Sequence, residues 1–241
     1  MTDTVRGTKL LLTGLSNSGK TSALSSLDPE KTLVISIDGK LFPLPIPHAN
    51  FAGFPDVNGF IFGYDTTDGG HVKGIVDKIN QFEETFGAYP EVIVIDTISR
   101  VANIIADNCM TKYTSYDIHT NISKQNAEFN KFVESQLIAA GISVVTTTHV
   151  TYDEKVGAYT DASSGAYKKT GGILSVHDHV SFFHVDGKKY KVSHRVPGLP
   201  CRTLLSEEEL PSVQLANDYS LADHLTLLRS KVDAVKKFSL D

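Results

Sequence analysis

An eight-residue glycine-rich segment, Gly14–Thr21, constrains this chain more than any other part of its sequence. It reads G-L-S-N-S-G-K-T, follows the apolar run Lys9–Thr13 and leads into the small-residue stretch Thr21–Leu27. In this pattern the glycines let backbone N–H groups point at phosphate oxygens, Lys20 neutralises the β- and γ-phosphates, and the Thr21 hydroxyl binds Mg²⁺. The segment therefore predicts a strand, a phosphate-binding loop and a helix, and with them a nucleotide site.

A second apolar run, Val92–Ile95, ends in the carboxylate of Asp96. An acid after a buried strand is often only a turn or cap residue. In a P-loop ATPase, however, the metal is held jointly by the loop hydroxyl and a carboxylate at a nearby strand end. We therefore predict that ATP is bound with Mg²⁺, and that Thr21 and Asp96 hold the metal. The residues expected to contact the nucleotide are Gly14, Leu15, Ser16, Asn17, Ser18, Gly19, Lys20, Thr21 and Ser22.

Short apolar runs alternate with helical patterns along the chain, which predicts an α/β fold with a mostly parallel central sheet flanked by helices. Helical spacing of apolar residues covers 72–86, with His71 as a helix start, and 122–140, while 41–55 and 151–172 show no periodicity. The turn Asp186-Gly187 predicts a C-terminal antiparallel hairpin between 173–185 and 189–196. The expected strands of the sheet are Lys9–Thr13, Thr32–Ile37, Gly59–Gly63, Val92–Ile95 and Ser143–Thr148.

The 241 residues suit one domain, with a core over about 8–205 and a helical segment over about 218–238. That last helix is expected to pack on its own sheet, with contact to a neighbouring subunit as the alternative. The net charge of −5 means that any nucleic-acid contact needs a local cluster of cations. Cys109 and Cys201 form no metal or redox motif, and no apolar run approaches the length of a membrane span, so we expect a cytoplasmic protein without membrane contact.

His149 ends the apolar strand that follows the second helical pattern. A polar side chain at that strand end would lie beside the γ-phosphate and could sense it, although an ordinary strand-end histidine is the alternative. Three further histidines, His177, His179 and His184, lie close together in the sequence. No cysteine or carboxylate completes a tetrahedral set around them, which argues against a metal site.

Taken in order, the P-loop, the strand ending in Asp96, the long helix, the strand ending in His149 and the terminal hairpin resemble the RecA-type ATPase core over roughly residues 8–205. Within that superfamily the chain looks most like the short phage-encoded RecA-like ATPases of single-strand annealing and recombination. The resemblance implies an ATPase with ATP at the subunit interface of a homo-oligomeric ring or filament. It also implies single-stranded DNA as a partner, a single-strand binding protein as a further one, and the host cytoplasm as location if the chain is phage-encoded.

The resemblance also assigns roles to residues after the core. It implies that His149 links the γ-phosphate to the loop 151–172, and that this loop meets DNA. On composition alone the same loop would be a solvated surface segment. Its lysines offer phosphate contacts and its tyrosines offer stacking surfaces, and these residues are Lys155, Lys168, Lys169, Tyr152, Tyr159 and Tyr167.

In RecA-like oligomers, basic residues near the terminal strand reach the neighbour's γ-phosphate. Lys191 and Arg195 match by position, with plain strand-edge charges as the alternative. One feature departs from the family pattern, because Lys40 stands where a water-orienting glutamate is expected. Asp38 is the residue that would substitute for it. The sequence therefore predicts nucleotide binding more firmly than hydrolysis.

Two other function classes remain open. A P-loop kinase of a nucleoside or another small molecule needs an arginine-bearing lid, and 151–172 contains no arginine. A nucleotide-switched DNA-loading or assembly protein with little turnover would fit the missing glutamate. A signalling GTPase is disfavoured, since the chain has no N-K-x-D motif.

Overall fold

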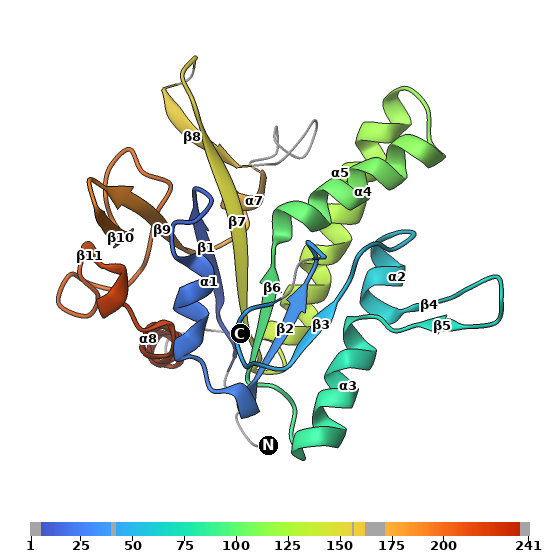
Figure 1. Ribbon diagram of the computed structural model, residues 1–241, viewed down its shortest axis with the longest axis horizontal. Coiled ribbons are helices and arrows are strands. Elements are labelled where there is room, and N and C mark those ends of the chain that lie inside the picture. The colour runs from blue at the N-terminus through green and yellow to red at the C-terminus, as the bar shows by residue number, and fades with distance from the viewer. Residues whose placement is uncertain (1–5, 40–41, 156, 162–171, 237–241) are drawn as a thin grey trace.

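The computed structural model describes residues 6–39, 42–155, 157–161 and 172–236. Its strands are β1 (Lys9–Gly14), β2 (Thr32–Ser36), β3 (His48–Asn50), β4 (Tyr64–Asp65), β5 (His71–Val72), β6 (Val92–Asp96), β7 (Ser143–Asp153), β8 (Ala158–Asp161), β9 (His179–Asp186), β10 (Lys189–Ser193) and β11 (Val213–Leu215). The main sheet has the order β11-β10-β9-β1-β7-β6-β2-β3, and β8 pairs with the end of β7 (Figure 1). The run from β9 to β3 is parallel, whereas β10 and β11 are antiparallel.

Helices cover both faces of this sheet (Figure 1). They are α1 (Lys20–Ala23), α2 (Val57–Phe62), α3 (Ile75–Phe86), α4 (Ile98–Lys112), α5 (Tyr116–Phe132), α7 (Gly172–Ser175) and α8 (Leu221–Lys236), with 3-10 turns η1 (Leu24–Ser26), η2 (Pro29–Lys31) and η4 (Ala216–Asp218) and the π-helical turn η3 (Val133–Ile138). The predicted fold class is thereby confirmed. Within the described part of the chain, every helix is too short or too polar to cross a lipid bilayer.

The central strands β1, β2 and β6 are buried on both faces, which explains their nearly continuous apolar sequences. Leu10 and Leu12 of β1 lie in a cluster with α1, η1 and α8, whereas Leu11 between them lies in a second cluster with α2 to α5. This is the twofold alternation of a strand between two layers of helices. Leu221 and Leu228 of α8 are fully buried in the first cluster, so α8 packs on the sheet of its own chain.

The expected strand at Gly59–Gly63 is wrong, because these residues form most of α2 and the turn after it. The Asp56 side chain caps this helix by accepting a hydrogen bond from the Gly59 N–H (2.9 Å), and Gly63 ends it with a φ of +84°. A short apolar run fits a buried helix as well as a buried strand. The edge of the sheet is instead formed by β3, which lies inside the segment expected to be irregular.

Three further elements differ from expectation. His71 lies in β5, paired with β4, and the helix begins only at Ile75, where the Asp77 carboxylate accepts a hydrogen bond from the Gly74 N–H (2.9 Å). The helix α4 follows Asp96 and was not predicted. The segment 151–172 begins as ordered hairpin, since β7 continues to Asp153 and pairs with β8, while 162–171 lie outside the described residues.

A polar cluster holds the start of α8 against β9 and β10. The Tyr219 hydroxyl is hydrogen-bonded to His224 Nδ1 (2.9 Å), and His194 Nδ1 to the Ser181 hydroxyl (3.0 Å). The two imidazole rings pack edge to face at 5.3 Å, and both are buried. Burial lowers the pKa of His194 to about 4 and that of His224 to about 3, so both rings are neutral in the folded protein.

These buried histidines predict a loss of stability in mild acid. Each binds a proton in the unfolded chain near pH 6.5 but not in the folded one, so their contribution is complete above that pH and falls below it. Between about pH 7.5 and 5.5, each histidine lowers the free energy of unfolding by about 1 kcal/mol. Urea unfolding at the two pH values measures this loss. The variant His224→Gln, which does not titrate, should show a smaller loss, and an unchanged one would contradict the assignment. The exposed His119→Gln is the control.

Candidate functional site

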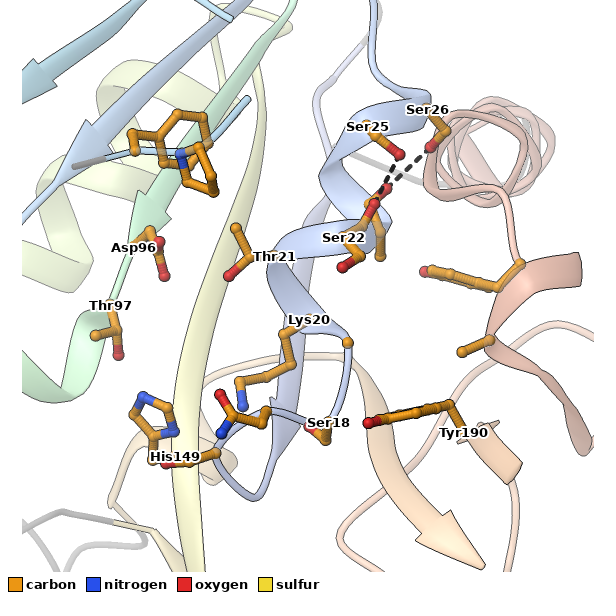
Figure 2. A pocket seen from close by; sticks show the side chains of 18 of the residues that line it. Ser18, Lys20, Thr21, Ser22, Ser25, Ser26, Asp96, Thr97, His149 and Tyr190 are labelled. Atoms are coloured by element: carbon orange, nitrogen blue, oxygen red, sulfur yellow. Dashed lines mark hydrogen bonds between the residues drawn. The ribbon is translucent and has the colours of Figure 1, made fainter. Parts of the chain in front are cut away.

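A cavity of about 830 Å³ opens at the carboxyl ends of the parallel strands, around the glycine-rich loop (Figure 2). Its size lies within the range of roughly 300–1,000 Å³ that is usual for small-molecule sites. All of the predicted nucleotide-contacting residues from Ser16 to Ser22 line it. Asp38, Asp96 and His149, predicted from separate parts of the sequence, line it too. The parallel order of β2, β6, β7 and β1 brings these strand ends together.

The loop between β1 and α1 depends on two glycines. Gly14 has a φ of +153°, and a Cβ atom there would overlap the Phe183 carbonyl oxygen of β9. Gly19 has a φ of +99°, which side-chain-bearing residues rarely adopt. Asn17 is also left-handed, with a φ of +58°. The loop therefore curls tightly against β9, and its sequence pattern follows from that conformation.

The loop also fixes its own polar side chains. The buried Lys20 ammonium donates hydrogen bonds to the carbonyl oxygens of Gly14 (3.0 Å) and Leu15 (2.8 Å), and the Ser18 hydroxyl donates to the Leu15 carbonyl (2.8 Å). Burial lowers the Lys20 pKa to about 8, although the nearby Asp96 carboxylate raises it. The cation is thus held inside the loop at the cost of part of its hydration.

The helix after the loop is short, since α1 is one turn long and continues as the 3-10 turn η1. The first N–H groups of a helix have no acceptor inside it. Those of Lys20, Thr21 and Ser22 therefore add to the N–H groups of the loop as phosphate donors. The predicted anion site rests on these few amide groups and Lys20 rather than on the dipole of a long helix.

The Asp96 carboxylate has a fixed orientation. The buried Thr147 hydroxyl of β7 donates a hydrogen bond of 2.5 Å to Asp96 Oδ1, and Figure 2 shows the Thr21 side chain directed toward Asp96 across the cavity. A hydroxyl, a carboxylate and phosphate oxygens are the ligands that Mg²⁺ prefers, with water completing its shell. The residues present therefore fit the predicted metal, and Thr21 and Asp96 would hold it.

The histidines 177, 179 and 184 form no metal site. His177 is buried between the Thr146 hydroxyl, 2.7 Å from Nε2, and the Ile173 carbonyl, 2.8 Å from Nδ1, and burial lowers its pKa to about 3. Among the described residues, no group of three or more His, Cys, Asp or Glu side chains could hold a metal ion. His177 instead fastens α7 to the core of the sheet.

His149 and Asp38, the residues of the two predicted catalytic roles, both line the cavity, and their roles stay predictions. β7 lies between β1 and β6, and its His149 pairs in register with Gly14. Figure 2 shows His149 next to Lys20, on the side of the cavity that also holds Asp96 and Thr97. Asp38 follows β2, which pairs with β6 up to Asp96. Lys40, the departure from the family pattern, lies outside the described residues.

Lys191 and Arg195 do not line this cavity. The Lys191 ammonium pairs with Asp186 across the hairpin (2.6 Å), and the Arg195 guanidinium binds Glu207 (2.9 Å) and the Leu210 carbonyl (2.5 Å). Within this chain, Arg195 therefore ties the segment after β10 to the strand end. Their role at a neighbour's phosphate stays a prediction.

Of the six residues predicted to contact DNA, three are described, Tyr152, Lys155 and Tyr159. Lys155 is exposed at the β7–β8 turn, and Tyr159 of β8 lies between Tyr152 (ring centroids 5.3 Å apart) and Phe182 (4.8 Å). Tyr152 is 54% exposed. Tyr167, Lys168 and Lys169 lie outside the described residues. The described part of the segment thus presents one tyrosine ring and one lysine to solvent.

Sequence reasoning missed one wall of the cavity, formed by Tyr190, Ala216, Asn217 and Tyr219. On β10 the buried Val192 belongs to the cluster with α1 and α8, so by alternation Tyr190 faces the same side and Lys191 the opposite one. That alternation was readable in the sequence. The approach of 216–219 was not, because it depends on β11 pairing with β10.

The hydrogen bond from Thr147 to Asp96 predicts that Thr147→Val weakens the metal site. The valine keeps the shape of the side chain but leaves the carboxylate without its donor, and the loss of such a partner typically reduces metal affinity or activity about 10–100-fold. The Mg²⁺ concentration that half-saturates ATP hydrolysis measures this. The adjacent Thr146→Val, which removes a buried hydroxyl bonded to His177 instead, is the matched control. Equal behaviour of the two variants would contradict the prediction.

The Lys20 pKa predicts that nucleotide affinity falls in alkali. The ammonium must be charged to attract phosphate, so ATP binding in the presence of Mg²⁺ should weaken as the pH rises above about 8, on the order of tenfold by about pH 9.5. Calorimetric titrations across this range measure it. In Lys20→Arg the side chain stays charged, so the pH dependence should flatten even if binding is weaker. A wild-type affinity that is constant to pH 9.5 would be inconsistent with this role.

Comparison with known protein families agrees with this geometry. The model of a family described as "AAA domain" matches residues 6–197, well over half of the chain and including every part of the cavity wall up to Tyr190. A comparison with curated proteins finds no match. The family consists of P-loop NTPases, and membership indicates nucleotide binding and hydrolysis, typically of ATP with Mg²⁺. The chain belongs to the AAA domain family.

Proposed function

We propose that this protein is an ATPase that passes the state of its nucleotide to single-stranded DNA through the β7–β8 hairpin. The observation that carries the proposal is the course of β7. This strand is 11 residues long, lines the cavity at His149 and then leaves the sheet to pair with β8. A change at the γ-phosphate would therefore reach Tyr152 through one continuous strand, and Lys155 in the turn that follows it.

The residues of the cavity divide the work of hydrolysis. Lys20 and the loop amides bind and orient the phosphates, and Thr21 and Asp96 hold the metal. Mg²⁺, when bound, neutralises charge that develops on the β- and γ-phosphate oxygens. Asp38 is the one carboxylate besides Asp96 that lines the cavity among the described residues, so it would orient the attacking water and accept its proton. His149 would contact the γ-phosphate.

The charges of the cavity favour an oligomer. Among the described lining residues, Lys20 and His149 are the only basic side chains, which is a small complement for a triphosphate. A neighbouring subunit would supply the missing cation, from Lys191 or Arg195. The ion pair of Lys191 is partly exposed to solvent and would cost little to break, whereas Arg195 would also have to release the Leu210 carbonyl. We therefore propose a ring or filament with ATP at the subunit interface.

The hairpin is suited to stacking more than to charge neutralisation. Asp153 and Glu154 lie beside Lys155 at its turn, so the net charge of the described tip does not attract phosphate. Tyr152, in contrast, offers a half-exposed ring, and stacking of a base on such a ring is worth about 1–3 kcal/mol. Unpaired bases present free faces, and duplex DNA does not. The proposed ligand is therefore single-stranded.

DNA-stimulated ATP hydrolysis tests this function. Single-stranded DNA should raise the turnover of the wild type, and Tyr152→Ala should weaken DNA binding about 5- to 150-fold, as expected for the loss of one stacked base. Tyr89→Ala is the matched control, because Tyr89 is equally exposed but precedes β6 at the opposite end of the sheet. Turnover that is indifferent to single-stranded DNA, with no DNA binding in a gel shift, would exclude the DNA half of the proposal.

A nucleotide-switched assembly protein with little turnover is the second candidate function. It is favoured by the observation that, among the described residues, Asp38 is the one carboxylate of the cavity besides the proposed metal ligand Asp96. Asp38 would therefore be the sole candidate base for hydrolysis. Wild-type protein that binds ATP but does not hydrolyse it, beside a Lys20→Ala variant that does not bind, would identify this function. Turnover that is lost in Asp38→Asn while ATP binding persists would instead identify the ATPase.

A further inference from the structure

We propose that a second cavity, at the base of the β4–β5 hairpin, binds a nucleoside monophosphate, either free or as the phosphorylated end of a DNA strand. This cavity is separate from the one around the glycine-rich loop, and its ligand does not follow from the function proposed above. Two lysines, an amide and an aromatic ring line it.

The second cavity has a volume of about 690 Å³ and lies at the edge of the sheet. Three segments line it: the end of β3 with the loop that follows (residues 50–53), the base of the hairpin (Tyr64, Val72 and Lys73) and the first turn of α3 (Lys78). Figure 1 shows the hairpin projecting from the molecule between α2 and α3. Asn50 pairs in register with Ser36 of β2, which lines the first cavity, so the two cavities open on neighbouring strands.

The base of the hairpin is held in place by backbone packing and by hydrogen bonds. A Cβ atom at Gly74 would overlap the Gly63 backbone nitrogen, so the segments before β4 and after β5 lie in backbone contact. The His71 imidazole is hydrogen-bonded to the carboxylates of Asp65 (2.8 Å) and Asp77 (3.4 Å), and neither carboxylate lines the cavity. The walls of the cavity are therefore formed before a ligand binds.

The charge of this cavity is positive. Lys73 is exposed and Lys78 is half-buried, with one hydrogen bond to Gln81 (3.2 Å), and neither ammonium forms a salt bridge within the described part of the chain. No carboxylate is among the described residues that line this cavity, whereas Asp38 and Asp96 line the first one. In a chain with a net charge of −5, two lysines without a counter-charge form a local site of attraction for an anion.

A phosphate monoester matches these two ammonium groups. It carries a charge of roughly −1.5 to −2 at pH 7, whereas each phosphodiester within a DNA strand carries a single negative charge. Lysine binds phosphate as a point charge, without the fixed geometry that arginine imposes. The chemistry of the pair therefore favours the monoester, which occurs on free nucleotides and at phosphorylated strand ends.

The size of the cavity indicates that the ligand is larger than phosphate. A phosphate group takes the space of only a few water molecules, at about 30 Å³ each, and would leave most of the cavity unfilled. Cavities of roughly 300–1,000 Å³ are usual for small organic ligands. The ligand therefore carries an organic group against the remaining walls.

Those remaining walls suit a nucleoside. Tyr64 is half-buried and offers part of its ring, and Phe51 is fixed by edge-to-face packing on Phe60, with 5.2 Å between the ring centroids. The exposed Asn50 side-chain amide has no hydrogen bond to another described residue, so it can pair with the polar edge of a base. Because this amide can rotate to present either its acceptor or its donors, the site would accept any base.

Calorimetric titration with thymidine monophosphate, thymidine and inorganic phosphate tests the site. The protein is first saturated with a non-hydrolysable ATP analogue and Mg²⁺, so that the first cavity is occupied. Thymidine monophosphate should bind more tightly than thymidine or phosphate. The double variant Lys73→Gln, Lys78→Gln should weaken its binding about tenfold. The matched control is Lys124→Gln, Lys131→Gln, which removes two exposed charges from α5 and should bind as the wild type does. Equal losses in the two double variants would overturn the site.

Tyr64→Leu tests the organic part of the ligand. The leucine keeps an apolar side chain against α2 but removes the ring, so binding of thymidine monophosphate should fall about fivefold or more while binding of inorganic phosphate is unchanged. Wild-type protein that binds phosphate as tightly as thymidine monophosphate would overturn the assignment of a nucleoside.

An oligonucleotide with and without a 5′-phosphate distinguishes the two sources of the ligand. Tighter binding of the phosphorylated strand, lost in Lys73→Gln, Lys78→Gln but kept in the control, would assign the site to strand ends. Equal binding of the two strands, beside binding of thymidine monophosphate, would assign it to free nucleotides. Protein that binds neither thymidine monophosphate nor the 5′-phosphate would refute the second site and leave the proposed function unaffected.

Discussion

The position of β1 between β7 and β9 is the constraint on which the rest of the structure depends. Parallel pairing on both sides aligns Gly14 with His149 on one neighbour and with Phe183 on the other. The chain must then turn away from the sheet at Gly14, where the Phe183 carbonyl oxygen leaves no space for a side chain. Every group of the cavity is placed relative to that turn. A larger residue at Gly14 would separate β1 from β9 and displace the loop as a whole.

The same arrangement explains why a lysine is buried at this point. An ammonium in a protein interior loses hydration, which is costly unless polar groups replace the water. The carbonyl oxygens of Gly14 and Leu15 do so for Lys20, and Asp96 adds an opposite charge nearby. Hydration is only partly replaced, as the lowered pKa of Lys20 indicates. A bound phosphate group would supply a further hydrogen-bond acceptor for the Lys20 ammonium. Nucleotide binding would therefore lower the free-energy cost of burying this charge.

Much of this could be predicted from the sequence because local signals and tertiary structure agree in the central strands. The run Val92–Ile95 consists of β-branched residues alone, which favours a strand, and Lys9–Thr13 leads directly into the glycine-rich loop pattern; both are strands. The prediction of a strand at Gly59–Gly63 is wrong because apolar residues alone do not distinguish a buried strand from a buried helix. The residue that caps the helix, Asp56, lies outside this run. Tyr190 and Asn217 were missed for another reason. They come together only through the pairing of β10 with β11, and no spacing in the sequence reports such a pairing.

Two consecutive threonines of β7, Thr146 and Thr147, form side-chain hydrogen bonds on opposite sides of the strand. Thr147 holds the carboxylate of Asp96, whereas Thr146 faces the other way and is bonded to His177, which in turn holds the Ile173 carbonyl of α7. Arg202 binds the His177 carbonyl from the far side (2.9 Å). β7, which bears His149, is therefore anchored before it leaves the sheet. Its last residues, Val150–Asp153, are held mainly by pairing with β8. A displacement of His149 would consequently be taken up by the hairpin rather than by the core, because the core side of β7 is fixed by buried hydrogen bonds.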